Sequence, residues 1–94
     1  MSQDTEPLSE QVDATLRALE DARAILVAGV LALKELEEEV KERILELEAN
    51  DSPRAEVHPL RSAHAALITA RKELVLAEQR TAARLRGMQR QHVT

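Results

Sequence analysis

Residues 12–47 read VDATLRALEDARAILVAGVLALKELEEEVKERILEL, a stretch whose apolar residues are spaced for a long helix. Six of them recur every seven positions: Val12, Leu19, Leu26, Leu33, Val40 and Leu47. A second series follows four residues after each of the first five: Leu16, Arg23, Val30, Glu37 and Ile44. Alternating spacings of four and three are typical of a coiled-coil helix. We therefore predict a long helix whose seam carries two charged residues, Arg23 and Glu37.

The C-terminal half carries a second repeat of the same length. Leu60, Leu67 and Leu74 are followed at sevenfold spacing by Thr81 and Met88. An alanine stands three residues after each leucine, and these alanines are Ala63, Ala70 and Ala77. This pattern predicts a second helix whose leucine and alanine seam packs closely against the first helix.

Turn-forming residues separate the two repeats, with Asn50, Asp51, Ser52 and Pro53 in one group and His58 and Pro59 in the next. We predict a disordered tail over 1–8 and a single helical-hairpin domain over 9–91. Within that domain, helix 1 covers about 9–49, the loop about 50–58 and helix 2 about 59–90. A turn centred near Arg54 predicts antiparallel pairing of residues whose numbers add to about 108.

A second apolar stripe remains on each helix beside the seam. One two-helix hairpin buries a single stripe per helix, and a chain of 94 residues without cysteine has no disulfide to reinforce a small core. The predicted fold is therefore all-α: two long antiparallel helices that associate into a four-helix bundle or larger oligomer. The predicted oligomer interface is Ile25, Leu26, Gly29, Val30, Leu33, Leu36, Ile68, Val75 and Leu76.

Gly29 stands in the middle of the apolar run, where a glycine costs a helix about 1 kcal/mol. We interpret it as the site of a close helix crossing at the dimer interface. The apolar run over 24–33 has ten residues, whereas a membrane span needs about 20. The polar, acidic N-terminus does not match a secretory signal, so we expect a cytoplasmic protein that does not enter a membrane.

Charge is divided unevenly along the chain. Residues 1–50 hold 13 acidic and 5 basic side chains, whereas residues 51–94 hold 4 acidic and 8 basic ones. Oppositely charged helices that pair with each other account for this division. The cluster of Arg80, Arg84, Arg86 and Arg90 supports an alternative function, a nucleic-acid-associated accessory protein such as a packaging-type helical oligomer.

The composition excludes several kinds of site. Without cysteine there is no thiolate zinc site or cysteine nucleophile, and without aromatic residues there is no base-stacking platform. No glutamate is followed three residues later by histidine, which is the ligand spacing of di-iron bundles. We predict no enzyme activity and no cofactor, and a metal-binding bundle is the weakest alternative.

The expected function is that of a non-enzymatic, self-associating hairpin that serves as an assembly, scaffold or adaptor module. Its expected partners are a second copy of the chain and another protein. The sequence leaves open the identity of that protein, the number of copies and the relative direction of two hairpins. It also leaves open whether the arginine cluster binds a ligand or only pairs with glutamates.

Overall fold

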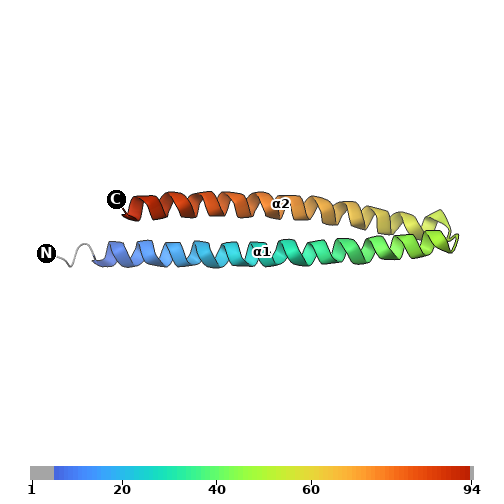
Figure 1. Cartoon of the computed structure of the whole chain (residues 1–94), viewed down its shortest axis with the longest axis horizontal. Coiled ribbons are helices and arrows are strands. Elements are labelled where there is room, and N and C mark those ends of the chain that lie inside the picture. The colour runs from blue at the N-terminus through green and yellow to red at the C-terminus, as the bar shows by residue number, and fades with distance from the viewer. Residues whose placement is uncertain (1–5, 94) are drawn as a thin grey trace.

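Two long helices lie side by side and antiparallel in the computed structural model, which describes residues 6–93 (Figure 1). Helix α1 spans Glu6–Ala49 and helix α2 spans Arg54–Val93. The molecule measures 76 × 17 × 15 Å, and its radius of gyration is 21.3 Å. A compact chain of this length has a radius of gyration of about 12 Å. The predicted all-α hairpin is confirmed, and its shape is a rod with Glu6 and Val93 at one end and the connection at the other.

Helix α1 ends in a motif that uses one residue in the left-handed backbone region. Asp51 has a φ of 55°. The Ser52 N–H donates to the Leu47 carbonyl at 2.9 Å, and the Asp51 N–H donates to the Glu48 carbonyl at 3.1 Å. These two bonds form a Schellman motif, which satisfies carbonyls that the last helical turn leaves open. The chain therefore reverses within residues 50–53.

Helix α2 begins at Arg54, five residues before the predicted boundary, and continues through Pro59. The Pro53 carbonyl accepts the first helical bonds, from the N–H of Glu56 at 2.9 Å and of Val57 at 3.4 Å. Pro59 removes one hydrogen bond to the Ala55 carbonyl, but both residues are exposed and water can satisfy that group. The added turns bury Val57, which is 6% exposed. Burial outweighs the preference of a pre-proline residue for extended backbone.

Helix α1 also begins earlier than predicted, at Glu6 rather than near residue 9. Pro7 falls in the first turn, where a missing N–H costs no helical hydrogen bond. Part of the predicted tail over 1–8 is therefore helical, and residues 1–5 lie outside the described residues.

The register of the hairpin follows from the short connection. Because the connection is centred between residues 51 and 52, residues at the same level in α1 and α2 have numbers that add to about 103. Gly29 and Leu74 mark this register, since a Cβ at Gly29 would lie 3.1 Å from Leu74 Cδ1. The predicted sum of 108 is a few residues higher than this contact gives, because α2 starts earlier than expected, and the residue numbers of the three cross-helix ion pairs add to between 101 and 109. Gly29 marks a close approach within the chain itself.

The contact between the helices follows a heptad seam on both sides. All residues of the two predicted α1 series are buried or half-buried except Arg23. On α2 the buried and half-buried seam consists of Val57, Leu60, His64, Leu67, Arg71, Leu74, Glu78, Thr81, Leu85 and Met88. Its second series thus lies one residue later than the predicted alanines. Ala63 is exposed, and Ala70 and Ala77 are half-buried beside the seam.

The core of this hairpin is thin. Among the described residues the buried apolar ones are Ile44, Val57, Ala82 and Leu85, and no large side chain is fully buried. The chain exposes 7352 Å² of surface, whereas a compact monomer of its mass exposes about 5,400 Å². The hairpin therefore leaves unburied much of the surface that a compact fold of this size would cover.

Candidate interaction surface

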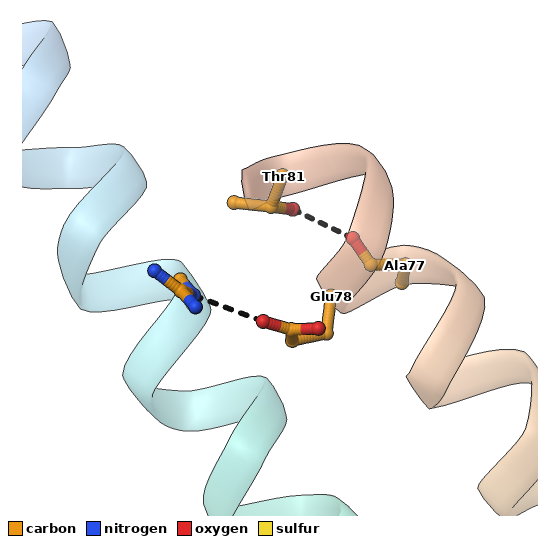
Figure 2. Close-up of polar contacts among 4 residues, drawn as sticks. Ala77, Glu78 and Thr81 are labelled. Carbon is orange, nitrogen blue, oxygen red and sulfur yellow. Dashed lines mark hydrogen bonds and ion pairs between the residues drawn. The ribbon is translucent and has the colours of Figure 1, made fainter. Parts of the chain in front are cut away.

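The two charged residues of the α1 seam each pair with an opposite charge on α2. The Arg71 Nε–H donates to Glu37 Oε2 at 2.5 Å, and Glu37 is only 8% exposed. The Arg23 Nε–H donates to Glu78 Oε1 at 2.9 Å. Figure 2 shows the Glu78 carboxylate directed from α2 toward α1. The seam thus contains two ionic layers among apolar ones, and each layer joins the two helices.

The Glu37 carboxylate acts directly on the charge of its partner. Its hydrogen bond, and then its negative charge, raise the pKa of Arg71 above the ordinary value for arginine. The stabilisation linked to this shift is fully present below the ordinary arginine pKa and is lost only as the pH rises through the raised value. Arg71 is therefore a cation throughout the neutral range, and this layer is a fixed charge pair.

A hydroxyl group near the second ionic layer is satisfied locally. The Thr81 hydroxyl donates to the Ala77 carbonyl at 2.8 Å, as Figure 2 shows beside Glu78. A threonine that bonds to the carbonyl four residues earlier hides its polar group from the helix contact. Thr81 can therefore occupy a half-buried seam position without a partner on α1.

Large apolar side chains are exposed at mid-length on both helices. Ile25 is 72% exposed and Leu31 is 58% exposed, and Val27, Leu36 and Leu76 are also exposed. We call these five residues the central patch. Exposed apolar side chains scattered singly are ordinary on protein surfaces, and only a contiguous group is typical of an interaction site, so the sides of the hairpin that these residues occupy decide how they can be used.

The structure places the predicted interface residues in three settings. Ile25, Leu36 and Leu76 are exposed and belong to the central patch. Leu26, Val30 and Leu33 are half-buried in the seam, where they serve the hairpin itself. Ile68 and Val75 are half-buried, and Gly29 approaches α2. The sequence interpretation did not include Val27, although its position in the apolar run could have indicated it.

The four central-patch residues of α1 divide between two edges of the hairpin. The residues Glu20, Arg23, Ala24, Val27, Ala28, Leu31 and Leu85 line one shallow apolar groove. We call this side the Leu31 edge. Ile25 and Leu36 lie on another side of α1, rotated by roughly 150° about the helix axis from Val27 and Leu31, because each residue turns a helix by about 100°. We call their side the Ile25 edge, and the two edges give the hairpin two separate apolar surfaces.

Charged side chains follow the Leu31 edge toward the connection. Glu48 and Arg61 form an ion pair across it. Both residues line a hollow together with Lys34, Lys41 and His64. This part of the surface is ionic and self-paired, which makes it a poor continuation of the apolar groove.

Two clusters of like charge have no ion-pair partner among residues 6–93. Arg80, Arg84 and Arg86 are exposed on α2. The exposed acidic cluster on α1 consists of Glu35, Glu38, Glu39 and Glu42. Within residues 6–93 none of these seven side chains takes part in an ion pair. Arg90, the fourth arginine of the predicted cluster, does make a polar interaction. The expected pairing of the arginine cluster with α1 of the same chain is therefore not observed for these three.

Other kinds of site find little support in the described part of the chain. Over residues 6–93 no three His, Asp or Glu side chains are grouped so as to hold a metal ion. His58 is exposed and His64 is half-buried in the seam, while the side chain of His92 lies outside the described residues. Neither helix, over the described residues, combines the length and apolar character of a membrane span.

The exposed apolar residues and the exposed like-charge clusters are the features of the described residues from which a function can be inferred. Comparisons of the sequence with protein-family models and with curated proteins, and of the fold with solved structures, gave no match.

Proposed function

We propose that the protein is a non-enzymatic, self-associating helical hairpin that serves as an assembly, scaffold or adaptor module. The observation that carries this proposal is the central patch. Ile25, Val27, Leu31, Leu36 and Leu76 are large apolar side chains, and they remain exposed at the middle of a chain that already uses one seam per helix. A second copy that packs on one edge of this patch completes a four-helix bundle.

The surface area of the chain supports the same proposal. The 7352 Å² exposed by the hairpin exceeds that of a compact monomer by about 1,900 Å². A standard protein interface buries about 800 Å² on each partner. One such contact therefore fits within the excess surface. Because the patch has two edges, self-association through one leaves the other open to a different protein, as an adaptor requires.

Removing the apolar character of the patch should dissociate the oligomer. We expect the parent chain to form a dimer or larger species in a light-scattering concentration series. The Ile25→Glu/Leu31→Glu variant should weaken association by roughly 100-fold or more, because charged side chains replace apolar anchors on both edges.

A matched variant distinguishes the effect of changing the patch from the effect of adding two negative charges anywhere on the surface. Leu45→Glu/Ala55→Glu introduces the same two charges at exposed sites near the connection, and we expect it to associate within about threefold of the parent. A parent chain that stays monomeric at every concentration contradicts the proposal. Equal loss of association in the two double variants also contradicts it.

A second candidate function is supported by the exposed, unpaired arginines. Arg84 and Arg86 are exposed and have no carboxylate partner within residues 6–93, and such side chains contact nucleic-acid phosphates. If this function holds, the parent should shift a nucleic-acid probe at low salt, and binding should fall steeply as salt is added. Arg84→Glu/Arg86→Glu should then lose roughly tenfold or more in affinity. The absence of any shift by the parent at low salt excludes this candidate.

A further inference from the structure

A stripe of apolar residues follows the Ile25 edge along α1. Its six members are spaced alternately by four and three residues, which is the spacing of a helix seam. Ile25 and Leu36 are its large members, and both are exposed. The others are glycine or alanine, of which Ala22 and Gly29 are half-buried. This Ile25 stripe consists of Ala18, Ala22, Ile25, Gly29, Ala32 and Leu36. Helix α1 thus carries a second seam-like surface, most of which α2 leaves exposed.

The Ile25 stripe is complementary to a reversed copy of itself. If a second α1 lies against it in the opposite direction, with the centre of the contact at the level of residue 27, facing residues have numbers that add to 54. Each large side chain then faces a small residue, which lets two helices approach closely without leaving voids. The facing pairs are Ile25 with Gly29, Leu36 with Ala18, and Ala22 with Ala32. The side-chain sizes therefore define one register for this contact.

Two charged residues of α2 have the same relation on the same edge. Arg61 lies on the Leu31 edge and is followed at sevenfold spacing by a series that includes Val75 and Ala82. Glu73 and Arg80 each precede one of these by two residues, and two residues turn a helix by about 200°, so both lie on the Ile25 edge. Both are exposed, and neither forms an ion pair within residues 6–93. A second α2 that runs in the opposite direction can bring Glu73 of each copy level with Arg80 of the other.

The centres of these two contacts fall at one level of the hairpin. The Ile25 stripe reverses about residue 27, and the charge pair reverses about the point between residues 76 and 77. Near the middle of the hairpin, residues at the same level have numbers that add to about 103, as the contact of Gly29 with Leu74 shows. The two centres therefore agree to within one residue. A single two-fold axis, at right angles to the helices, satisfies α1 and α2 together.

We infer that the protein forms a dimer of hairpins through the Ile25 edge, with the connections at opposite ends and with α1 packed antiparallel on α1 of the second copy. This inference rests on the proposed self-association and assigns its surface, direction and register. The two Ile25 stripes form the apolar centre of the contact. Glu73 of each copy pairs with Arg80 of the other where α2 packs on α2, and this pairing favours the same direction. Asp21 and Glu35 lie further around α1 at the solvent-facing rim, where charges contribute little.

The opposite direction gives a poorer match. With both connections at the same end, α1 packs on α2 of the second copy, and facing residues have numbers that add to about 103. Gly29 then lies level with Glu73 of the second copy, and Ala22 lies level with Arg80, each to within one residue. Charged side chains thus face the apolar stripe, where they lose hydration without gaining a partner.

Engineered disulfides distinguish the two directions, because the chain has no cysteine of its own. In the inferred dimer Ala22 of one copy faces Ala32 of the other. An equimolar mixture of Ala22→Cys and Ala32→Cys chains should therefore form a disulfide-linked heterodimer on mild oxidation. Each variant alone should form roughly tenfold less linked dimer, because like residues then lie about 15 Å apart along the helices. A mixture of Ala32→Cys and Ala70→Cys is the matched control, since these residues face each other only when both connections lie at the same end.

Each outcome of the oxidation has one meaning. Linkage in the first mixture and not in the control supports the inference. Linkage in the control mixture alone overturns the inferred direction and leaves self-association standing. If neither mixture is linked although light scattering shows the parent to be dimeric, the contact through the Ile25 edge is wrong. A parent that is monomeric at all concentrations overturns the proposed function and the inference together.

A charge exchange tests the contact between the two α2 helices. Glu73→Arg and Arg80→Glu should each weaken self-association by roughly fivefold at low salt, because like charges then meet. The double variant Glu73→Arg/Arg80→Glu restores opposite charges across the contact and should associate within about twofold of the parent. A double variant that associates no better than the single variants overturns the inferred pairing of Glu73 with Arg80.

Discussion

Replacing Ile44 with alanine is expected to lower the free energy of unfolding by about 2–3 kcal/mol, among the largest effects available to a single substitution in this chain. Ile44 is 9% exposed and is one of only four buried apolar residues in the described part of the chain. The register places it level with Leu60, where the two seams meet near the connection. Truncating its side chain removes buried apolar surface from a core with few buried residues, so the loss is a large share of the total stability.

The neighbouring residue supplies a matched control. Leu45 is 55% exposed, although it differs from Ile44 by one position on the same helix. Leu45→Ala removes a similar apolar volume and should lower the free energy of unfolding by less than about 1 kcal/mol. Alanine is a better helix former than either residue, and the gain is slightly larger for Ile44→Ala because isoleucine is the poorer helix former, so helix propensity works against the expected difference.

The measurement is urea denaturation followed by far-ultraviolet circular dichroism. All samples need one protein concentration, because self-association adds to apparent stability by mass action. A loss of helical signal in Ile44→Ala before urea is added also supports the expectation, since it means that the variant has passed its stability limit. Equal losses for Ile44→Ala and Leu45→Ala contradict it, because the seam would then lie elsewhere on α1.

The α1 seam was predictable from sequence, whereas only the leucine series of the α2 seam was, and the reason lies in the charges. On α1 the apolar residues at Val12 through Leu47 repeat over five heptads, so the periodic signal is strong. On α2 the second series contains Arg71 and Glu78, which look like solvent-facing residues when the helix is read alone. Their place in the seam depends on Glu37 and Arg23 of the other helix. That complementarity is a property of the pair and becomes visible only when the register is known.

The register itself depended on one local competition. His58 and Pro59 indicated that the helix begins after the turn, at Pro59. The helix begins at Arg54 instead, because the added turns bury Val57. Sequence rules for proline describe the local cost, whereas the burial of Val57 depends on the distant residues of α1. The exposed central patch was predictable because the apolar run of α1 is longer than one seam can cover. The absence of ion-pair partners for Arg80 and Arg84 within residues 6–93 was not predictable from sequence, since it depends on the positions of all nearby carboxylates.

The ionic layer of Glu37 and Arg71 gives the second large effect. Arg71→Leu is expected to lower the free energy of unfolding by about 2–3 kcal/mol, because it leaves the buried Glu37 carboxylate without its cation. Glu37→Leu should cost less, about 1 kcal/mol, since the Arg71 side chain is 31% exposed and can turn toward water. The order of the two effects follows from which partner is more deeply buried.

A matched variant at an exposed ion pair tests this asymmetry. Arg43→Leu breaks the ion pair of Arg43 and Glu46, whose side chains are 65% and 64% exposed, and should change stability by no more than about 0.5 kcal/mol. If Glu37→Leu costs as much as Arg71→Leu, the burial argument is wrong.

The double variant Glu37→Leu/Arg71→Leu separates stability from specificity. Replacing a buried ion pair with apolar side chains is often neutral or stabilising, so we expect it to be as stable as the parent or more stable by about 1 kcal/mol. We expect the charged layers, however, to disfavour wrong pairings of α1 with an α2 helix. A slip of α2 by one heptad in one direction brings Glu37 to Glu78, and a slip in the other brings Arg23 to Arg71.

Both slips preserve the apolar layers but place like charges together. The short connection of residues 50–53 limits slippage within one hairpin, but helices of different copies have no such restraint. We therefore expect the double variant to form a mixture of oligomers in light scattering, while the parent forms one species. A double variant that is both more stable and uniform in size would show that the ionic layers do not select the pairing.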